Sequence, residues 1–380
     1  MPDNRKRVCM ITSSVLVVRW FLLDQLRALA QHYDVTVLVN GEEAALQTEV
    51  GVRVIRVGLE RKISPWRDLK ALFELMRIFR REQFDLVHSV TPKAGLLSMV
   101  AAWLSRVPVR LHTFQGEVWA TRQGFMRAML RFFDRLIARL STRVLVVSES
   151  ERQFLISQRI IRDDQSDVLA KGSICGVDIT RFAPPQPEQR VIVRQQAGLA
   201  DSNVLFLYVG RLALDKGLLD LAQAFDHVWQ QYPQARLMIV GPDEEGVLAR
   251  MDQLKLVSRK AITVHGYTGT PEHFMRMGDV VCLPSYREGF GMVLLEAAAM
   301  RVATMASRIY GISDAVEEGV TGLLHPPADV AAIELTMLQL LLNPGLRDQL
   351  AAAGMQRAQR DFSRQIVIQA VVDFYAKQLL

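Results

Sequence analysis

Two short clusters in the second half of the chain combine charged side chains with glycines at spacings that suit a phosphorylated ligand. The first is the segment 288–291, Glu-Gly-Phe-Gly, which follows an apolar run at 280–283 and precedes an expected helix over 292–300. Glycines let the backbone turn tightly and approach a ligand, and the start of a helix offers unpaired N–H groups to a phosphate. Glu288 and Glu296 then reach different parts of one ligand, such as the hydroxyls of a sugar or a ribose. The alternative is a strand-loop-helix corner whose glutamates are solvated.

The second cluster places two cations at the end of the apolar run 204–209. Arg211 and Lys216 stand five residues apart and are framed by Gly210 and Gly217. Such cations can hold a diphosphate, because charge-assisted hydrogen bonds are strong where water is excluded. The Walker spacing G-x-x-x-x-G-K-[ST] is absent from this cluster. The alternative is a surface turn with two solvated cations.

The elements that must position these clusters follow an alternating pattern. Short β-branched runs predict strands at 7–11, 35–39, 52–57, 86–89, 110–113, 144–147, 204–209, 235–240, 262–264 and 280–283. Helix-period segments lie at 20–31, 66–81, 94–104, 124–140, 292–300 and 333–369. Strands that alternate with helices predict parallel sheets covered on both faces. The fold class is therefore α/β, with two doubly wound domains.

Three prolines at 184, 185 and 187 mark the expected domain boundary, because proline continues neither a helix nor a central strand. We expect an N-terminal domain over 1–185, a C-terminal domain over 186–360, and a last helix over 361–380 that packs back on the first domain. Ligands of such sheets bind beyond the C-terminal ends of the strands. A cleft between the two domains is the default active site.

Composition excludes several classes of protein. The 380 residues are 50% hydrophobic and 23% charged, which excludes a disordered, collagen-like or disulfide-rich chain. The formal charge of +6 is uneven: residues 1–185 hold 28 basic and 19 acidic side chains, and residues 186–380 hold 18 and 21. The basic first half points to an anionic partner.

Cysteine usage and hydropathy indicate a cytoplasmic protein. The three cysteines are far apart and show no C-x-x-C spacing, which fits a reducing compartment. The N-terminus imitates a signal peptide, but Arg19 and Asp24 interrupt its apolar part. No uncharged apolar run approaches the roughly 18–20 residues of a membrane-spanning helix, so we expect a soluble protein or one bound to a membrane surface. The sequence has no D-x-D and no paired-histidine motif, and we predict that no metal and no resident cofactor are needed.

Together the clusters resemble the retaining, sugar-nucleotide-dependent glycosyltransferases of family 4, which have the GT-B fold of two Rossmann-like domains facing across a cleft. The residues that carry the resemblance are Gly210, Arg211, Lys216 and Gly217, the E-x7-E pair Glu288 and Glu296, Gly241 and Pro242, the segments 265–267 and 316–324, and Gly176, Val177, Asp178, Arg181 and Phe182. The resemblance spans nearly the whole chain. Segments 20–23 and 88–95 look like bacterial members that add N-acetylhexosamines to lipid-linked glycans.

The resemblance implies a role for each matching residue. Arg211 and Lys216 would hold the donor diphosphate, Glu296 the ribose hydroxyls, and Glu288 would lie near the donor sugar ring as a catalytic group. The remaining donor contacts would come from the backbone around Tyr267, Phe290, Gly291, Met292 and Val293. In this family the anomeric configuration is retained, and the leaving diphosphate helps to take the proton of the acceptor.

The implied reaction moves a sugar, an N-acetylhexosamine, from a UDP-sugar to a lipid-diphosphate-linked saccharide in bacterial O-antigen, lipopolysaccharide or capsule assembly. Three departures from the family pattern stand against it: Gln115 replaces a frequent histidine, 12–14 replaces a Gly-Gly loop, and Arg301 with Ala303 replaces a glycine and a proline. His112 is a catalytic candidate, although a histidine in an apolar strand is more often a core residue. A UDP-sugar epimerase and a catalytically degenerate partner subunit are the alternatives.

A basic stripe in the first half suggests how such an enzyme meets its acceptor. Arg127, Arg131, Arg135 and Arg139 recur every four residues on the expected helix 124–140, beside apolar side chains. This pattern suits an anionic inner-membrane surface. The alternative is a core-packed helix with a solvated basic face. No nucleic-acid recognition motif is present, so no nucleic-acid partner is expected.

Overall fold

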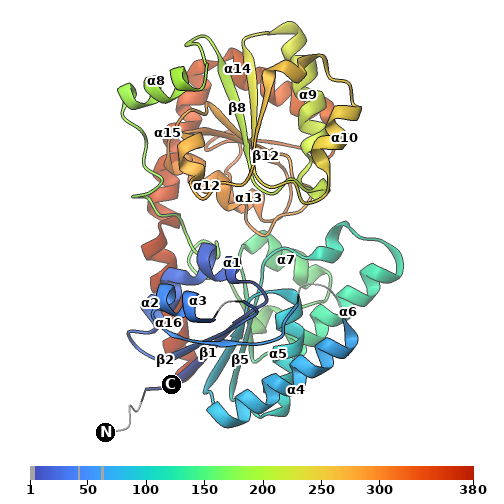
Figure 1. The fold of residues 1–380 in the computed structure, drawn as a ribbon, viewed down its shortest axis with the longest axis vertical. Helices are drawn as coiled ribbons and strands as arrows, with labels where there is room; N and C mark the ends of the chain where they lie inside the picture. Colours follow the sequence, from blue (N-terminus) through green and yellow to red (C-terminus); the bar gives the residue numbers. More distant parts are fainter. Residues whose placement is uncertain (1–4, 42, 61–63) are drawn as a thin grey trace. The chain divides into compact units, whose positions relative to one another are not determined.

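The computed structural model describes residues 5–41, 43–60 and 64–380, and its contacts divide the chain into two compact units (Figure 1). The N-terminal unit comprises Met1–Cys175 together with Gln365–Leu380, and the C-terminal unit is Gly176–Arg364. Each unit is built on its own parallel sheet, which confirms the two doubly wound α/β domains predicted from the alternating pattern.

The described strands of the N-terminal unit form one sheet in the order β3-β2-β1-β4-β5-β6-β7, and every pair is parallel. Their bounds are β1 Arg7–Thr12, β2 Asp34–Val39, β3 Arg53–Arg56, β4 Leu86–Ser89, β5 Val109–Phe114, β6 Arg143–Val146 and β7 Ser166–Asp167. The central strands are buried on both faces, as helix-covered parallel strands must be.

Helices cover both faces of this sheet. Their bounds are α1 Val15–Val17, α2 Leu23–Leu29, α3 Glu43–Val50, α4 Pro65–Glu82, α5 Pro92–Leu104, α6 Gly124–Leu140, α7 Glu149–Ser157 and α16 Arg364–Leu379, with a π-helical segment at Val18–Leu22 and 3₁₀ turns at Val118–Thr121 and Asp163–Gln165. Alternate side chains of β1 point to opposite faces of the sheet. Cys9 and Ile11 belong to one hydrophobic core, and Val8 and Met10 belong to the other.

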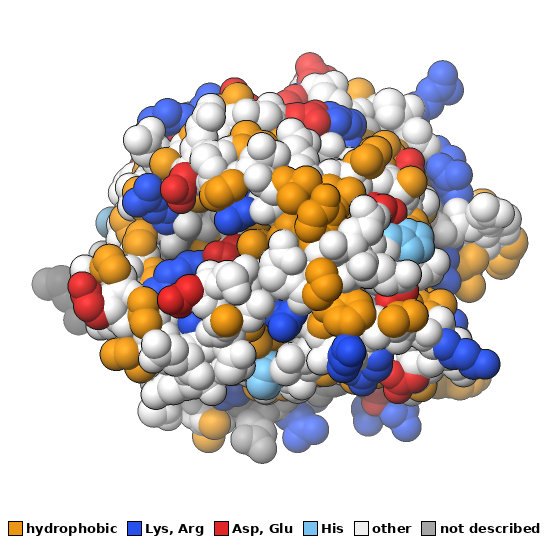
Figure 2. Space-filling model, turned by 90° about the horizontal axis from the view of Figure 1, so that it is seen from above, with side chains coloured by type: hydrophobic (Ala, Val, Ile, Leu, Met, Phe, Trp, Pro, Cys, Tyr) orange, Lys and Arg blue, Asp and Glu red, His pale blue; other side chains and the backbone are white. Residues whose placement is uncertain are grey.

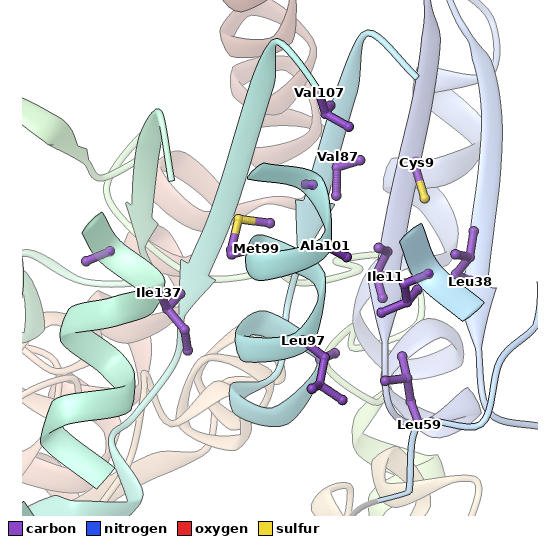
Figure 3. Packing of buried hydrophobic residues seen from close by; sticks show 14 of the residues in the cluster. Cys9, Ile11, Leu38, Leu59, Val87, Leu97, Met99, Ala101, Val107 and Ile137 are labelled. Atoms are coloured by element: carbon purple, nitrogen blue, oxygen red, sulfur yellow. The ribbon is translucent and has the colours of Figure 1, made fainter. Parts of the chain in front are cut away.

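The core under α4, α5 and α6 is shown in Figure 3, where side chains of β1, β4, α5 and α6 gather between helix and sheet. Ile11, Val87, Met99 and Ile137 are members of this cluster, and each is almost fully buried. The helices α4, α5 and α6 are thereby fixed as neighbours in one layer, with α5 packed against both of the others.

The last helix, α16, belongs to the N-terminal unit. Val371, Phe374 and Tyr375 lie in the core on the side of α2 and α3. The hydroxyl of Tyr375 lies 2.6 Å from Nδ1 of His88 on β4, and Nε2 of His88 lies 2.7 Å from Thr113 Oγ1. A buried hydrogen-bonded network therefore ties the end of the chain to the central strands.

The described strands of the C-terminal unit form a second parallel sheet in the order β10-β9-β8-β11-β12-β13. The strand bounds are β8 Val204–Val209, β9 Ala235–Val240, β10 Ile262–His265, β11 Val280–Leu283, β12 Ala303–Ser307 and β13 Leu323–His325. The helix bounds are α8 Pro187–Gln196, α9 Leu218–Gln231, α10 Val247–Gln253, α11 Pro271–Met275, α12 Met292–Ala299, α13 Ile312–Ala315, α14 Val330–Leu342 and α15 Pro344–Phe362, with 3₁₀ turns at Leu214–Lys216 and Val257–Ala261.

The boundary between the units lies before the proline run on which the sequence placed it. Gly176 is the first residue of the C-terminal unit, and Val177 pairs with Ser363 in a parallel bridge. The N–H of Val177 donates to Phe362 O at 2.8 Å, and the N–H of Arg364 donates to Val177 O at 2.9 Å. These bonds hold the segment before the prolines on the C-terminal unit, so the prolines lie inside that unit.

Surface charge is mixed on the face of the molecule that Figure 2 shows, where acidic and basic side chains lie among scattered apolar ones. Within the described residues, no helix is both long enough and apolar enough to cross a membrane.

Candidate active site

The candidate site begins where β8 and β9 end, at two glycines whose backbones nearly touch. Gly210 donates its N–H to Val240 O at 2.9 Å, and Gly241 has φ 149°. A Cβ on Gly241 would collide with the carbonyl of Gly210. Only glycine therefore fits at Gly241, and the close approach fixes the path of the chain into Arg211.

Arg211 follows this turn, and neighbouring side chains bind both its backbone carbonyl and its guanidinium. Its carbonyl accepts a hydrogen bond from the buried hydroxyl of Tyr208 at 2.8 Å, and its guanidinium pairs with Glu244 at 2.6 Å. Burial lowers the pKa of this guanidinium, but the hydrogen bond and charge of Glu244 outweigh the burial, so the net direction is upward. The arginine stays charged at any physiological pH.

Lys216 and Glu288 come together directly, although 72 positions separate them in the sequence. Lys216 Nζ lies 2.6 Å from Glu288 Oε1, both side chains are largely buried, and Ser285 Oγ donates to the same oxygen at 2.9 Å. The two clusters found in the sequence therefore form one site. Its lysine and its first glutamate are oriented by each other.

Further contacts lock the loop after β8 to the loop after β11. Asp215 pairs with Arg287 at 2.8 Å, and the hydroxyl of Tyr286 donates to Asp220 at 2.6 Å. Gly217, with φ 67°, is the N-cap of α9, and a Cβ there would collide with the carbonyl of Pro284. The position of Lys216 is thus set by rigid backbone on both sides.

The start of α12 is built for close approach. Gly291, with φ 78°, is its N-cap, and Phe290 is buried against Phe362 with 5.5 Å between the ring centroids. Behind this loop, a Cβ on Gly311 would collide with the carbonyl of Gly289. Met292 and Val293, the first two helical residues, are half-buried. Their N–H groups belong to the first turn of α12, and this end of a helix favours an anion.

Glu296 lies in the same helix, and its surroundings raise its pKa. Burial raises the pKa to about 7, the nearby Arg181 and Arg364 lower it, and Glu272 raises it. Arg181 is itself held by Glu272 at 2.8 Å and by the carbonyl of Gly269 at 2.7 Å. Glu296 is therefore a carboxyl group that changes charge near neutral pH, at the place where the resemblance puts a ribose.

Tyr267, the remaining donor candidate, follows β10 and is 65% exposed. It lies on the same edge of the sheet as the other clusters, because β10, β9 and β8 are parallel neighbours. An exposed aromatic ring at this edge can stack on a base.

His112 belongs to the N-terminal unit, whereas the residues described so far belong to the C-terminal unit. It is buried on β5, its Nδ1 lies 2.8 Å from Ser89 Oγ, and its ring meets Phe114 edge-on. Burial lowers its pKa to about 3, with a smaller contribution from His88, so the ring is neutral at physiological pH. These surroundings are those of a core histidine. Gln115, three residues further along the chain, donates to Val90 O at 3.4 Å.

The arginines of α6 make contacts within the N-terminal unit. Arg131 and Arg135 donate to the carbonyl of Gln158, and Arg135 also donates to that of Arg159, beyond the end of α7. Arg127 and Arg131 lie over the buried ring of Trp119, at 5.8 and 5.4 Å from its centroid. Arg139, in the last turn, is exposed. Much of the basic stripe is therefore used to hold α6, α7 and Trp119 together.

At the positions that depart from the family pattern, the neighbouring helices and strands still form. Arg301 adopts the left-handed conformation itself, with φ 57°, at the turn between α12 and β12. This conformation costs a non-glycine residue roughly 1–2 kcal/mol. Ala303 begins β12, and in the first loop Ser13 Oγ lies 3.1 Å from Thr91 Oγ1.

The partners of Arg211 and Glu288 were not predicted from the sequence; they are Glu244 and Tyr208 for Arg211, and Ser285 for Glu288. Glu244 had a signal, since it stands two residues after the Gly-Pro pair that follows the strand 235–240, at the same sheet edge as Arg211. Ser285 and Tyr208 had none, because their roles depend on the rotation of side chains at strand ends. Within the described residues, no group of three or more His, Cys, Asp or Glu side chains is placed to hold a metal ion.

Two family models match the chain, one in each unit. The model described as "Glycosyl transferase 4-like domain" matches residues 18–172, and the model described as "Glycosyl transferases group 1" matches residues 189–357. The matched regions contain the candidate residues described above.

Two curated relatives match over most of their length. The capsular polysaccharide biosynthesis glycosyltransferase CapM of Staphylococcus aureus is 28% identical over 84% of this chain and 83% of its own. The UDP-Gal:α-D-GlcNAc-diphosphoundecaprenol α-1,3-galactosyltransferase of Escherichia coli is 26% identical over 71% of this chain and 70% of its own.

Solved structures share the fold. Alr3699/HepE from Anabaena, in complex with UDP and glucose, has a TM-score of 0.82 at 18% identity and covers 98% of this chain and 100% of its own. WaaG, a glycosyltransferase involved in lipopolysaccharide biosynthesis, has a TM-score of 0.76 at 15% identity and covers 97% and 99%.

Proposed function

Because this chain belongs to the family 4 glycosyltransferases with the GT-B fold, we propose that it transfers an N-acetylhexosamine from a UDP-sugar to a saccharide carried on a lipid diphosphate, with retention of the anomeric configuration. One observation carries the proposal. Lys216 and Glu288 meet at the C-terminal edge of one sheet, beside Arg211 and the start of α12.

The geometry suits departure of a nucleoside diphosphate. The largest charge that develops in the transfer is on the leaving diphosphate, and stabilising it lowers the barrier most. Arg211, Lys216 and the first N–H groups of α12 supply positive charge at one place. Lys216 in turn orients Glu288, whose carboxylate would lie beside the donor sugar ring. The acceptor hydroxyl would pass its proton to the leaving diphosphate.

The relatives support the donor and the acceptor classes. The Escherichia coli relative is named for a UDP-linked donor and a diphosphoundecaprenol acceptor, and the Staphylococcus aureus relative for capsule biosynthesis. We therefore propose a role in bacterial surface-glycan assembly at the cytoplasmic face of the inner membrane. The basic N-terminal unit would meet the anionic membrane and the lipid-linked acceptor, and the C-terminal unit would bind the donor. Transfer would need no divalent metal, since Arg211 and Lys216 supply the charge, so activity should persist in EDTA.

The test is a transfer assay with purified protein, a panel of UDP-sugars and a polyprenyl-diphosphate-linked N-acetylglucosamine in detergent. We expect a product one sugar heavier, with the anomeric configuration of the donor. Lys216→Ala and Glu288→Gln should each lower kcat/KM by about 100-fold or more, as loss of a group that stabilises the transition state does. Arg250→Ala, an exposed cation on α10 of the same unit, is the matched control and should stay near wild type.

Two results would replace the proposal. Conversion of a UDP-sugar to its epimer without any acceptor would make the protein an epimerase. No binding of any nucleoside diphosphate by calorimetry, in a folded protein, would make it a catalytically inactive partner subunit.

A further inference from the structure

One layer of the N-terminal unit carries large apolar side chains that the core does not use. On α4, Trp66 is 85% and Phe73 60% exposed, with Leu69 between them. On α6, Phe125 is 82% and Phe132 59% exposed. Single exposed apolar residues are common, but several aromatic ones on helices of the same layer mark an interaction site. We call these five residues the aromatic surface.

The helices that carry the aromatic surface are fixed relative to each other. Figure 1 shows α4, α5 and α6 together along one side of this unit, and α5 packs against both of the others. Lys93 in the first turn of α5 pairs with Asp68 in the first turn of α4 at 2.5 Å. Trp66, Leu69 and Phe73 are spaced by three and four residues, so they share one face of α4.

The aromatic surface also lies near the edge of the sheet where ligands bind. Each of the three helices connects two parallel strands, and therefore starts at the edge where the preceding strand ends. Trp66 and Phe125 stand at the very starts of α4 and α6. An acceptor that reaches this edge from a bilayer would pass beside them.

Outward charge on this layer is positive. The three helices carry ten basic and four acidic side chains. The acidic ones are engaged within the unit: Asp68 pairs with Lys93, Glu82 with Arg53 and Arg81, Asp134 accepts from the indole of Trp119, and Glu74 accepts from the N–H of Gly58. The basic residues of the outer face of α4 are exposed. Arg67 and Arg81 pair with Glu60 and Glu82, and the other exposed ones are Lys70, Arg77 and Arg80.

The arginine stripe of α6 contributes less than its sequence suggests. Arg131 and Arg135 are bound to carbonyls beyond α7, and Arg127 and Arg131 lie over Trp119. The exposed side chains of α6 outside these contacts include its aromatic ones, Phe125 and Phe132, together with Met126 and Arg139.

We propose that the aromatic surface inserts into the headgroup region of an anionic bilayer, with the exposed basic residues of α4 against the lipid phosphates. Aromatic side chains favour this region, and each lysine or arginine near an anionic surface adds on the order of 1 kcal/mol. This inference rests on the proposed function, in which the N-terminal unit meets the membrane. It places the aromatic residues of α4 and α6 in the lipid, rather than the arginines of α6.

The test is flotation of the full-length protein with vesicles of phosphatidylcholine alone and of phosphatidylcholine with one third phosphatidylglycerol. We expect binding to the anionic vesicles and much weaker binding to the neutral ones. Trp66→Ser combined with Phe125→Ser should lower the partition coefficient at least about tenfold, because two apolar side chains leave the lipid. The matched control is Val257→Ser combined with Leu335→Ser, two comparably exposed apolar residues of the C-terminal unit, which should bind as wild type does.

The outcomes separate this contact from the proposed function. Transfer to a short-chain, water-soluble acceptor should be unchanged in the Trp66→Ser/Phe125→Ser variant. Wild-type protein that transfers sugar but ignores anionic vesicles would overturn the contact and leave the function standing. Vesicle binding that is equal in both double variants would also overturn it. A concentration-dependent dimer that the Trp66→Ser/Phe125→Ser change dissociates, without vesicle binding, would assign the surface to a second copy instead.

Discussion

Glu296 is the residue of the candidate site whose charge changes near neutral pH. Its pKa of about 7 arises mainly from burial, and Arg181 opposes that shift. Only the ionised form accepts hydrogen bonds from both hydroxyls of a ribose. Above the pKa the carboxylate is ready for the ligand, and below it the carboxyl must first lose a proton.

We therefore expect the affinity for a UDP-sugar to rise as pH rises from 6 to 8, by about five- to tenfold, since the ionised fraction of a group with pKa 7 changes by that factor. A UDP-sugar is the right probe because its diphosphate is fully ionised across this range. Calorimetric titrations at several pH values measure the effect. Glu296→Gln should bind more weakly and without pH dependence, and a flat profile for the wild type would refute the assignment.

A pair of buried carboxyls in the N-terminal unit gives a different pH dependence. Glu117 hydrogen-bonds to Glu151, which also accepts from the N–H of Gly116. Burial, then the charge of Glu117, raises the pKa of Glu151 well above its ordinary value. The folded state thus binds this proton more tightly than the unfolded state, so the stability is present at acidic pH and is lost as pH rises through the folded-state pKa.

Glu151→Gln removes the need for the proton and keeps an oxygen for Gly116. We expect the variant to gain roughly 1–3 kcal/mol over wild type at pH 8.5, the usual cost of an uncompensated buried polar group, and to gain less at pH 5. Thermal unfolding at both pH values measures the difference. Glu149→Gln, an exposed glutamate on the same helix, is the control and should change little at either pH.

The sequence identified the charged residues of the site better than their environment. Arg211, Lys216, Glu288 and Glu296 could be found because glycines and strand ends flank them. The side chain that neutralises Arg211 lies 33 positions away, and the signal for it was its place two residues after a Gly-Pro pair at the same sheet edge. His112 shows the same limit: its residue type suggested chemistry, and only the packing shows that both its charge and its access to water are suppressed.

At the scale of elements, the loops of the candidate site depend on glycines that leave no room for a side chain. Gly217 is the clearest, because it combines a left-handed φ of 67° with a close approach to the carbonyl of Pro284. Gly246 is a suitable control position. It has φ 68° and is the N-cap of α10, but a Cβ added there would meet no atom within 4 Å.

We expect Gly217→Ala to weaken UDP-sugar binding and to destabilise the C-terminal unit by more than Gly246→Ala does. The second change incurs only the strain of φ, roughly 1–2 kcal/mol, whereas the first also forces the loops after β8 and β11 apart. Calorimetry and thermal unfolding of both variants give the comparison. Equal losses of affinity and stability in the two variants would mean that the backbone at Pro284 moves aside without a measurable cost.

Most of the long helices and β-branched strands were predicted, although α9, with 14 residues, was not among the expected helices. The strands 86–89, 204–209, 235–240 and 280–283 have the predicted bounds. Strand β12 was not predicted, because its five residues, Ala-Thr-Met-Ala-Ser, lack a β-branched run, nor were β13 and β7, which have three and two residues. The π-helical segment at Val18–Leu22 has no periodic signal of its own inside a longer helical pattern.

At the scale of the whole molecule, one unit is continuous and the other is assembled from both ends of the chain. Removal of residues 365–380 would take Val371, Phe374 and Tyr375 out of the core and leave Nδ1 of His88 without the hydroxyl of Tyr375. We expect this truncation to lower the unfolding temperature of the N-terminal unit severely, and to leave UDP-sugar binding to the C-terminal unit.

Thermal unfolding with and without a UDP-sugar measures the stability of the two units separately. At about 100 times its dissociation constant, a UDP-sugar adds roughly 2.7 kcal/mol to the unit that binds it. The shift should persist in the truncated protein while the other transition moves down. The milder Tyr375→Phe change removes one buried hydrogen bond and should cost about 1 kcal/mol in the N-terminal unit alone. Loss of the ligand shift on truncation would contradict the independence of the donor-binding unit.

The return of α16 to the N-terminal unit also sets the order in which a newly made chain matures. Ribosomes add about 5–20 residues per second, so roughly 10–40 s pass between synthesis of Cys175 and synthesis of the last helix. Throughout that interval the first-made unit lacks α16, so the apolar side chains that α16 covers stay exposed while the later-made unit is still being synthesised. We expect a chain that stops before residue 365 to keep these apolar side chains exposed to chaperones and proteases.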